Sequence, residues 1–197
     1  MQSAHGAAKR SNKSACEQGA PGAPDGNFIV SGNQITQAGY TQGRYENATQ
    51  ENGQGSYGIY AGSLQTVQIT GNQISGGRGD GIFASGLHFV VSANVLSGGG
   101  FKNATGIQVV NSVDMDIANN NLRGYGQAIL ATDRDTIRIR GNTIDASHSP
   151  TATAVVVKSG VKRVAVTDNA ITGGDAERCV DVGGLGLHKV KRDNLCW

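Results

Sequence analysis

The chain has 197 residues, and its 17 basic and 15 acidic side chains leave a net charge of +2. A charge this close to zero provides no basic field for nucleic acid or for an acidic membrane surface, so neither partner is predicted. Only 38% of the residues are hydrophobic and 5% are aromatic. The sequence shows no apolar run of transmembrane length, and its first five residues are too polar for a signal peptide.

The chain divides into two parts by composition. Residues 1–26 are rich in Gly, Ala, Ser and Lys and show no periodicity, which predicts a flexible N-terminal lead. Residues 27–197 carry a repeat and are predicted to form one domain. The repeat begins at residue 27 with its second strand, so the first strand of that coil is missing. The chain is therefore expected to continue a longer solenoid or to have this end covered by a partner.

A six-residue phrase, apolar-x-x-Asn-x-apolar, recurs through the second part. After a first interval of 39 residues, its asparagines are 22, 26, 22 and 27 residues apart. A period of this length predicts a solenoid. The repeated asparagines are Asn33, Asn72, Asn94, Asn120, Asn142 and Asn169.

Each repeat unit contains three short strands with alternating apolar and polar residues, as in Gly58–Ala61, Val67–Ile69 and the residue pair that follows each Asn. No window has helical spacing. The prediction is an all-β, right-handed parallel β-helix of about six and a half coils. Its first-strand core is expected to be Ile59, Ala61, Ile82, Ile107, Val109, Ile129, Val155, Val157 and Val180.

These phrases resemble the parallel β-helix repeats of the pectin-lyase-like superfamily, over residues 27–195. The resemblance implies that the outer face of the first sheet and the variable loops between third and first strands form a polysaccharide cleft. It also implies a lyase, epimerase or glycosidase if the chain is catalytic. The signature motifs of the active families of this fold are absent, and fold likeness does not carry an activity with it.

The repeated asparagines are predicted to form an interior ladder. An Asn can adopt the left-handed backbone of a sharp turn. Its amide can also donate to the side-chain carbonyl of the next coil, which satisfies groups that would otherwise be buried unpaired. The seventh place in the pattern falls on Asp193, where the ladder is expected to end.

Aromatic and amide side chains gather around the longest loop, residues 36–57. Flat rings beside amide donors suit sugars, which present apolar C–H faces and hydroxyls. Polysaccharide or another extended glycan is therefore the predicted ligand; the alternative is that the loop folds back over the rings. The predicted substrate-binding residues are Tyr40, Arg44, Tyr45 and Tyr57 of the loop with outward Tyr60 and Phe83 of the first sheet.

Carboxylates are scarce on the predicted first-sheet face, which weighs against catalysis. The candidate catalytic residues are Asp80, which begins one first strand, and Asp133 and Asp135, which follow another. A glycosidase needs two carboxyl groups at a set distance, and a calcium-dependent lyase needs several around one ion. No metal site and no cofactor are predicted, and no carboxylate cluster supports calcium.

The second sheet is expected to present an outward basic strip that includes Arg138, Arg140, Lys189 and Lys191. Cys179 and Cys196 fall in the same final coil, and the sequence leaves open whether they form a disulfide.

Two hypotheses about function also remain open. One is a polysaccharide-binding or polysaccharide-acting domain. The other is a structural β-helix segment of a phage tail spike or bacterial surface protein, trimeric or part of a longer solenoid. Both favour an extracellular, cell-surface or virion location over the cytoplasm.

Overall fold

The structure is a computed structural model that describes residues 27–36, 57–77, 79–101, 104–132, 135–148, 153–158, 160–173, 179–183 and 188–197. The predicted lead, residues 1–26, lies outside this part of the chain. The strands are β1 Asn27–Ser31, β2 Gln34–Thr36, β3 Tyr57–Thr70, β4 Gln73–Gly77, β5 Asp80–Ser92, β6 Val95–Gly98, β7 Thr105–Val110, β8 Asp114–Ala118, β9 Asn121–Arg123, β10 Gln127–Thr132, β11 Thr136–Arg140, β12 Thr143–Asp145, β13 Val155–Val157, β14 Arg163–Thr167, β15 Ala170–Thr172, β16 Val180–Val182, β17 His188–Arg192 and β18 Leu195–Cys196.

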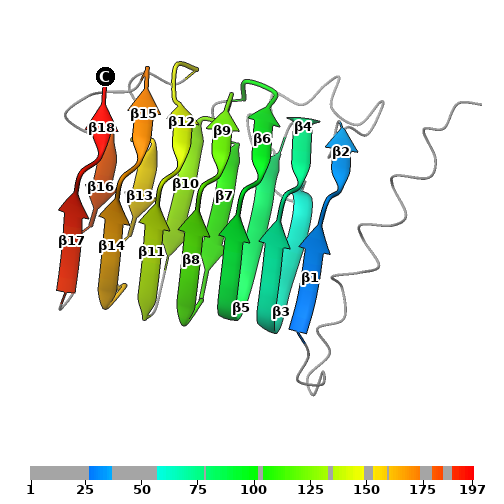
Figure 1. Cartoon of the computed structure of the whole chain (residues 1–197), viewed down its shortest axis with the longest axis horizontal. Helices are drawn as coiled ribbons and strands as arrows, with labels where there is room; N and C mark the ends of the chain where they lie inside the picture. The colour runs from blue at the N-terminus through cyan, green and yellow to red at the C-terminus, as the bar shows by residue number, and fades with distance from the viewer. Residues whose placement is uncertain are drawn as a thin grey trace, which may run out of the picture.

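The strands stack coil on coil in parallel (Figure 1). A first sheet is formed by β3, β5, β7, β10, β13 and β16, and a second by β1, β3, β5, β8, β11, β14 and β17. These two sheets are continuous because β3 and β5 each run through the first and second strands of their coils. The third sheet contains β2, β4, β6, β9, β12, β15 and β18. No helix in the described part of the chain is long and apolar enough to cross a membrane.

The right-handed parallel β-helix prediction is confirmed in its class. Within the described residues, the coils β3–β4, β5–β6, β7–β9, β10–β12 and β13–β15 are complete. The coil count is therefore slightly below the predicted six and a half. The β1–β2 coil lacks a described first strand, and the last coil ends in a third strand of two residues.

The core is one thin column of aliphatic side chains. Every predicted first-strand core residue is buried, from Ile59 at 3% exposure to Val180 at 3%. Each of these side chains meets its counterpart in the next coil, as Ile82 does with Ile107 and Ile107 with Ile129. Burial therefore repeats with every coil.

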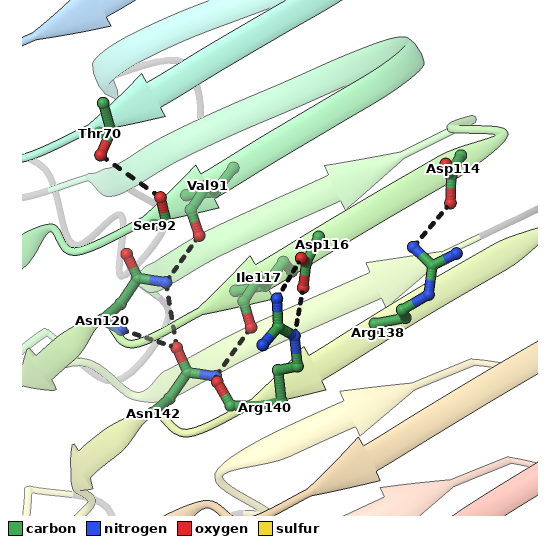
Figure 2. Close-up of polar contacts among 10 residues, drawn as sticks. All are labelled: Thr70, Val91, Ser92, Asp114, Asp116, Ile117, Asn120, Arg138, Arg140 and Asn142. Atoms are coloured by element: carbon green, nitrogen blue, oxygen red, sulfur yellow. Dashed lines mark hydrogen bonds and ion pairs between the residues drawn. The ribbon is translucent and has the colours of Figure 1, made fainter.

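The asparagine ladder is also observed (Figure 2). Asn120 Nδ2 donates to Asn142 Oδ1 at 3.0 Å, and Asn142 Nδ2 donates to Asn169 Oδ1 at 2.9 Å. The same Oδ1 of Asn142 accepts the backbone N–H of Asn120 at 2.9 Å, and Asn142 Nδ2 also donates to the carbonyl of Ile117 in the preceding coil at 3.0 Å. A buried ladder amide therefore has all of its polar atoms paired.

The expected conformation of the ladder asparagines is wrong in one respect. The left-handed residue of each turn is the one before the ladder Asn, and the ladder Asn itself has no positive φ. Glycine occupies the left-handed place in some coils, and Ala, Asn or Asp occupies it in others. The left-handed residues of these turns are Gly32, Gly71, Ala93, Asn119, Gly141, Asp168 and Asp193.

The last coil departs from the predicted alignment by one residue. Asn169 Nδ2 donates to Asn194 Oδ1 at 2.8 Å, so the seventh rung is Asn194, and Asp193 is the left-handed residue before it. Cys196 then takes the core row of Ile171 and forms a disulfide with Cys179. Their Cα atoms are 6.3 Å apart. A cross-link that closes a loop of this size stabilises a fold by about 3 kcal/mol.

Candidate functional site

The outer face of the first sheet carries a row of side chains that are aligned from one coil to the next. The strand register places one outward residue of each coil in a single row, as the sequence predicted, and this row crosses six coils. Only the first two members are aromatic, so the ring-bearing part of the face lies on β3 and β5. The row is Tyr60, Phe83, Gln108, Leu130, Val156 and Asp181.

Three rings form a cluster on this face. Tyr60 and Phe83 are stacked with their centroids 5.0 Å apart and their planes within 4°. Tyr57 lies against both, with centroids 5.3 Å from Tyr60 and 5.2 Å from Phe83. A Cβ at Gly62 would lie 2.6 Å from the Tyr60 hydroxyl oxygen, so the Tyr60 ring lies over a glycine that leaves room for it. The cluster remains accessible because 43% of Tyr60 is exposed.

Asp80 lies beside this aromatic cluster, at the start of β5 and in register with Tyr57. Its Oδ1 accepts the backbone N–H of Thr105 in the next coil at 2.7 Å. Burial raises the pKa of the Asp80 carboxyl, and the Thr105 N–H opposes that shift only in part. Burial also raises the pKa of Tyr57, and the charges of Asp80 and Tyr60 add to the effect. Asp80 is thus a carboxyl group that holds its proton more tightly than usual.

Tyr125 is a neighbour of Asp80 that the sequence did not single out. It lies in the turn between β9 and β10 and is only 4% exposed. A Cβ at Gly81 would lie 2.8 Å from the Tyr125 hydroxyl oxygen, so a glycine opens the space that the phenol fills. Burial, and then the charge of Asp80, raise the pKa of Tyr125. The available sequence signal was the pair Gly81 and Gly106 at the same place in successive repeats, because an added Cβ at either position would lie within 3.2 Å of the Tyr125 side chain.

Asp135 does not join Asp80. The strand register sets Asp80 level with Gln127, the first residue of β10, whereas Asp135 follows the last residue of that strand. Gln127 to Thr132 alone spans roughly 16 Å, against the 5 to 9.5 Å that separates the carboxyl groups of glycosidases. Asp135 instead forms an ion pair with Lys162 at 2.7 Å. Two of the three predicted catalytic carboxylates therefore lie at opposite ends of the first-sheet strands.

Several predicted site residues lie outside the described residues, namely Asp133, Tyr40, Arg44 and Tyr45. Their roles stay predictions, as does catalysis by Asp80 or Asp135. Among the described residues, no group of three or more His, Cys, Asp or Glu is placed to hold a metal ion.

The outer face of the second sheet carries charges that pair with one another (Figure 2). Arg140 donates to both carboxylate oxygens of Asp116, at 3.0 and 2.7 Å, and Arg138 donates to Asp114 at 3.2 Å. The expected basic strip is wrong at its C-terminal end. Lys189 and Lys191 pair in register with the core residues Val164 and Val166, and the outward place between them is Val190.

The fold and the comparison with protein families agree. The family model for right-handed β-helix regions matches residues 19–185, and the chain belongs to this family. Searches of curated proteins and of solved structures gave no match. The class of protein is therefore defined by its fold.

Proposed function

We propose that this β-helix binds an extended polysaccharide across the outer face of its first sheet, with the aromatic cluster of Tyr57, Tyr60 and Phe83 as the principal contact. The observation that carries this proposal is the partly exposed ring stack. A pyranose ring has an apolar C–H face that packs on an aromatic ring, and its hydroxyls need hydrogen-bonding groups at the rim.

The neighbouring residues support a ligand of several sugar units. The ordered row continues from Phe83 through Gln108, whose amide can donate to and accept from hydroxyls. Asp80 lies at the start of β5, in register with Tyr57 of the aromatic cluster. Adjacent coils are about 4.8 Å apart, so a chain of two or three sugars covers the coils of β3, β5 and β7.

The test is a binding screen of neutral and acidic polysaccharides, by affinity electrophoresis and then by titration calorimetry. Tyr60→Ala is expected to weaken binding about tenfold, which corresponds to about 1.4 kcal/mol of lost stacking. Leu130→Ala is the matched control, because Leu130 occupies the same row two coils beyond Phe83. The proposal fails if no polysaccharide binds or if both variants bind as well as the wild type.

Catalysis is tested separately by the release of reducing ends or unsaturated products from any polysaccharide that binds. Asp80→Asn and Asp135→Asn are expected to retain binding, since stacking does not depend on these carboxyl groups. Loss of product with retained binding would identify the chain as an enzyme. Absence of product from the wild type would identify a binding domain.

One observation favours the structural alternative. Val110, Leu130 and Val156 lie on the same outer face and are only partly buried, which would suit packing between chains. Under this alternative the wild type sediments as a trimer and Leu130→Glu as a monomer, while no polysaccharide binds.

A further inference from the structure

Lys191 in the last coil continues a row of the second sheet that is apolar in every earlier coil. Strand β17 pairs with β14 so that the backbone of Lys189 is in register with Val164 and that of Lys191 with Val166. Both valines are buried, at 3% and 0% exposure. The C-terminal end of the core column is therefore covered, at least by Lys191, with a side chain that carries a charge.

The Lys191 amine forms a hydrogen bond with a backbone carbonyl at a strand edge. Its Nζ donates to the carbonyl of Val180 in β16 at 2.7 Å. Cys179 and Gly183 point backbone groups at β13, because the Cys179 carbonyl accepts from the Val155 N–H and the Gly183 N–H donates to the Val157 carbonyl. Backbone groups alternate in direction along a strand, so the Val180 carbonyl points away from β13. No described strand pairs with that side of β16.

The opposite end of the solenoid presents the complementary edge. Gly32 N donates to Thr70 O in the next coil, so by alternation Ile29 points its backbone groups away from β3. No described strand pairs with β1 on that side. Every later ladder Oδ1 accepts from the preceding Asn, whereas Asn33 Oδ1 has no donor among the described residues.

We propose that Lys191 is an end cap that stops a second copy of this chain from adding its β1 edge to the β16–β18 end. The strands of every coil run in the same direction, and so do the hydrogen bonds of the asparagine ladder. The β1 edge of one copy could therefore pair in parallel with the β16–β18 end of another. Such a head-to-tail contact does not close and would build a filament. A lysine at an edge is one way in which sheets avoid this outcome.

The cap acts through two physical effects. An incoming strand would have to displace the Lys191 amine from the Val180 carbonyl. It would also bury that ammonium group between two coils, and a buried, unpaired charge is costly. Replacing Lys191 with an apolar residue removes both obstacles and continues the apolar column to the end face.

The experiment compares Lys191→Met with Arg192→Met in the full chain, with the disulfide intact. Arg192 lies next to Lys191 on β17 but faces outward, in register with Thr167. Both variants lose one positive charge, so net charge is matched. Sedimentation and electron microscopy over a range of concentrations should show filaments or a rising mass for Lys191→Met only. The wild type and Arg192→Met should keep a constant mass.

The identity of the added edge is tested by combining Lys191→Met with Ile29→Pro. A proline at Ile29 removes an N–H that faces away from β3, so pairing within the chain is kept while the edge loses a donor. The double variant should no longer assemble; continued assembly would exclude β1 as the incoming strand.

Lys191→Gln serves as a second variant in case Lys191→Met does not fold, because it removes the charge and keeps a donor for Val180. It should assemble in the same concentration range in which the wild type keeps a constant mass. A constant mass for whichever of these variants retains its strand signal in circular dichroism would overturn the proposal.

Discussion

The turn between the second and third sheets and the outer face of the first sheet obey different rules. A left-handed residue and a ladder Asn recur in each of the seven such turns that the structure describes, and the Asn side chains bond directly to each other. On the outer face, the residue in the same row changes from Tyr60 to Phe83, Gln108 and Leu130 in successive coils. A position whose partner is its own copy in the next coil has to repeat. A position that faces solvent or a ligand is free to differ.

The largest effect is expected in the ladder. Asn142→Leu should lower the free energy of unfolding by about 1–3 kcal/mol, because Asn120 and Asn169 each lose a partner inside a buried turn. Asn33→Leu should cost less, since Asn33 is only partly buried and has a neighbour in the ladder on one side alone. Urea unfolding followed by circular dichroism measures both. Equal effects at the two positions would contradict the ladder as the source of stability.

The left-handed position should show a smaller effect whose sign depends on the residue present. Gly71 has φ +65, and an added Cβ would have nothing within 4 Å, so Gly71→Ala should destabilise the fold by about 1 kcal/mol through backbone strain alone. Ala93 has φ 53, and Ala93→Gly should stabilise by about the same amount. The matched pair is measured by the same unfolding titration. Changes of the same sign in both variants would show that side-chain packing, not φ, governs this place.

On the first sheet, Asp80 is expected to affect how the free energy of unfolding depends on pH. The folded pKa of Asp80 lies above its ordinary value of 3.8, so between these two values the folded chain holds a proton that the unfolded chain has released. The free energy of unfolding contributed by Asp80 therefore falls as pH rises through that window, and Asp80→Asn should remove this fall.

Asp145 provides a control with the opposite sign. Hydrogen bonds from Ser147 lower its pKa, so its contribution to stability is lost as pH falls through the lowered value. In Asp145→Asn, the free energy of unfolding should therefore no longer include the fall at low pH that Asp145 causes in the wild type. Unfolding titrations between about pH 3 and pH 8 compare the two variants. If the free energy of unfolding has the same slope against pH in Asp80→Asn as in the wild type, burial does not raise the pKa of the Asp80 carboxyl.

The sequence was sufficient to predict the coil, its core and six of the seven ladder residues. A β-helix buries the same column in each turn, so Ile82, Ile107 and Ile129 must recur at equivalent places, and their period is visible without a structure. The outward row that contains Tyr60 and Phe83 followed from the same two-residue alternation. Which rings touch did not follow from it, because contact depends on the stacking of β3 on β5.

Tertiary structure alone decided how the residues of the last coil align with those of the coil before it, and which residues surround Asp80. With Asp193 in the seventh Asn place, the repeated phrase aligns Val190 and Leu195 with apolar residues that are buried in the preceding coil, but these two side chains are 43% and 62% exposed. The alignment is set by Asn194, which continues the ladder, and by Cys196, which reaches Cys179; both are contacts between residues far apart in the chain. Tyr125 likewise comes to lie near Asp80 only through the stacking of coils. A local pattern records which face a residue occupies, but the neighbours on that face come from other coils.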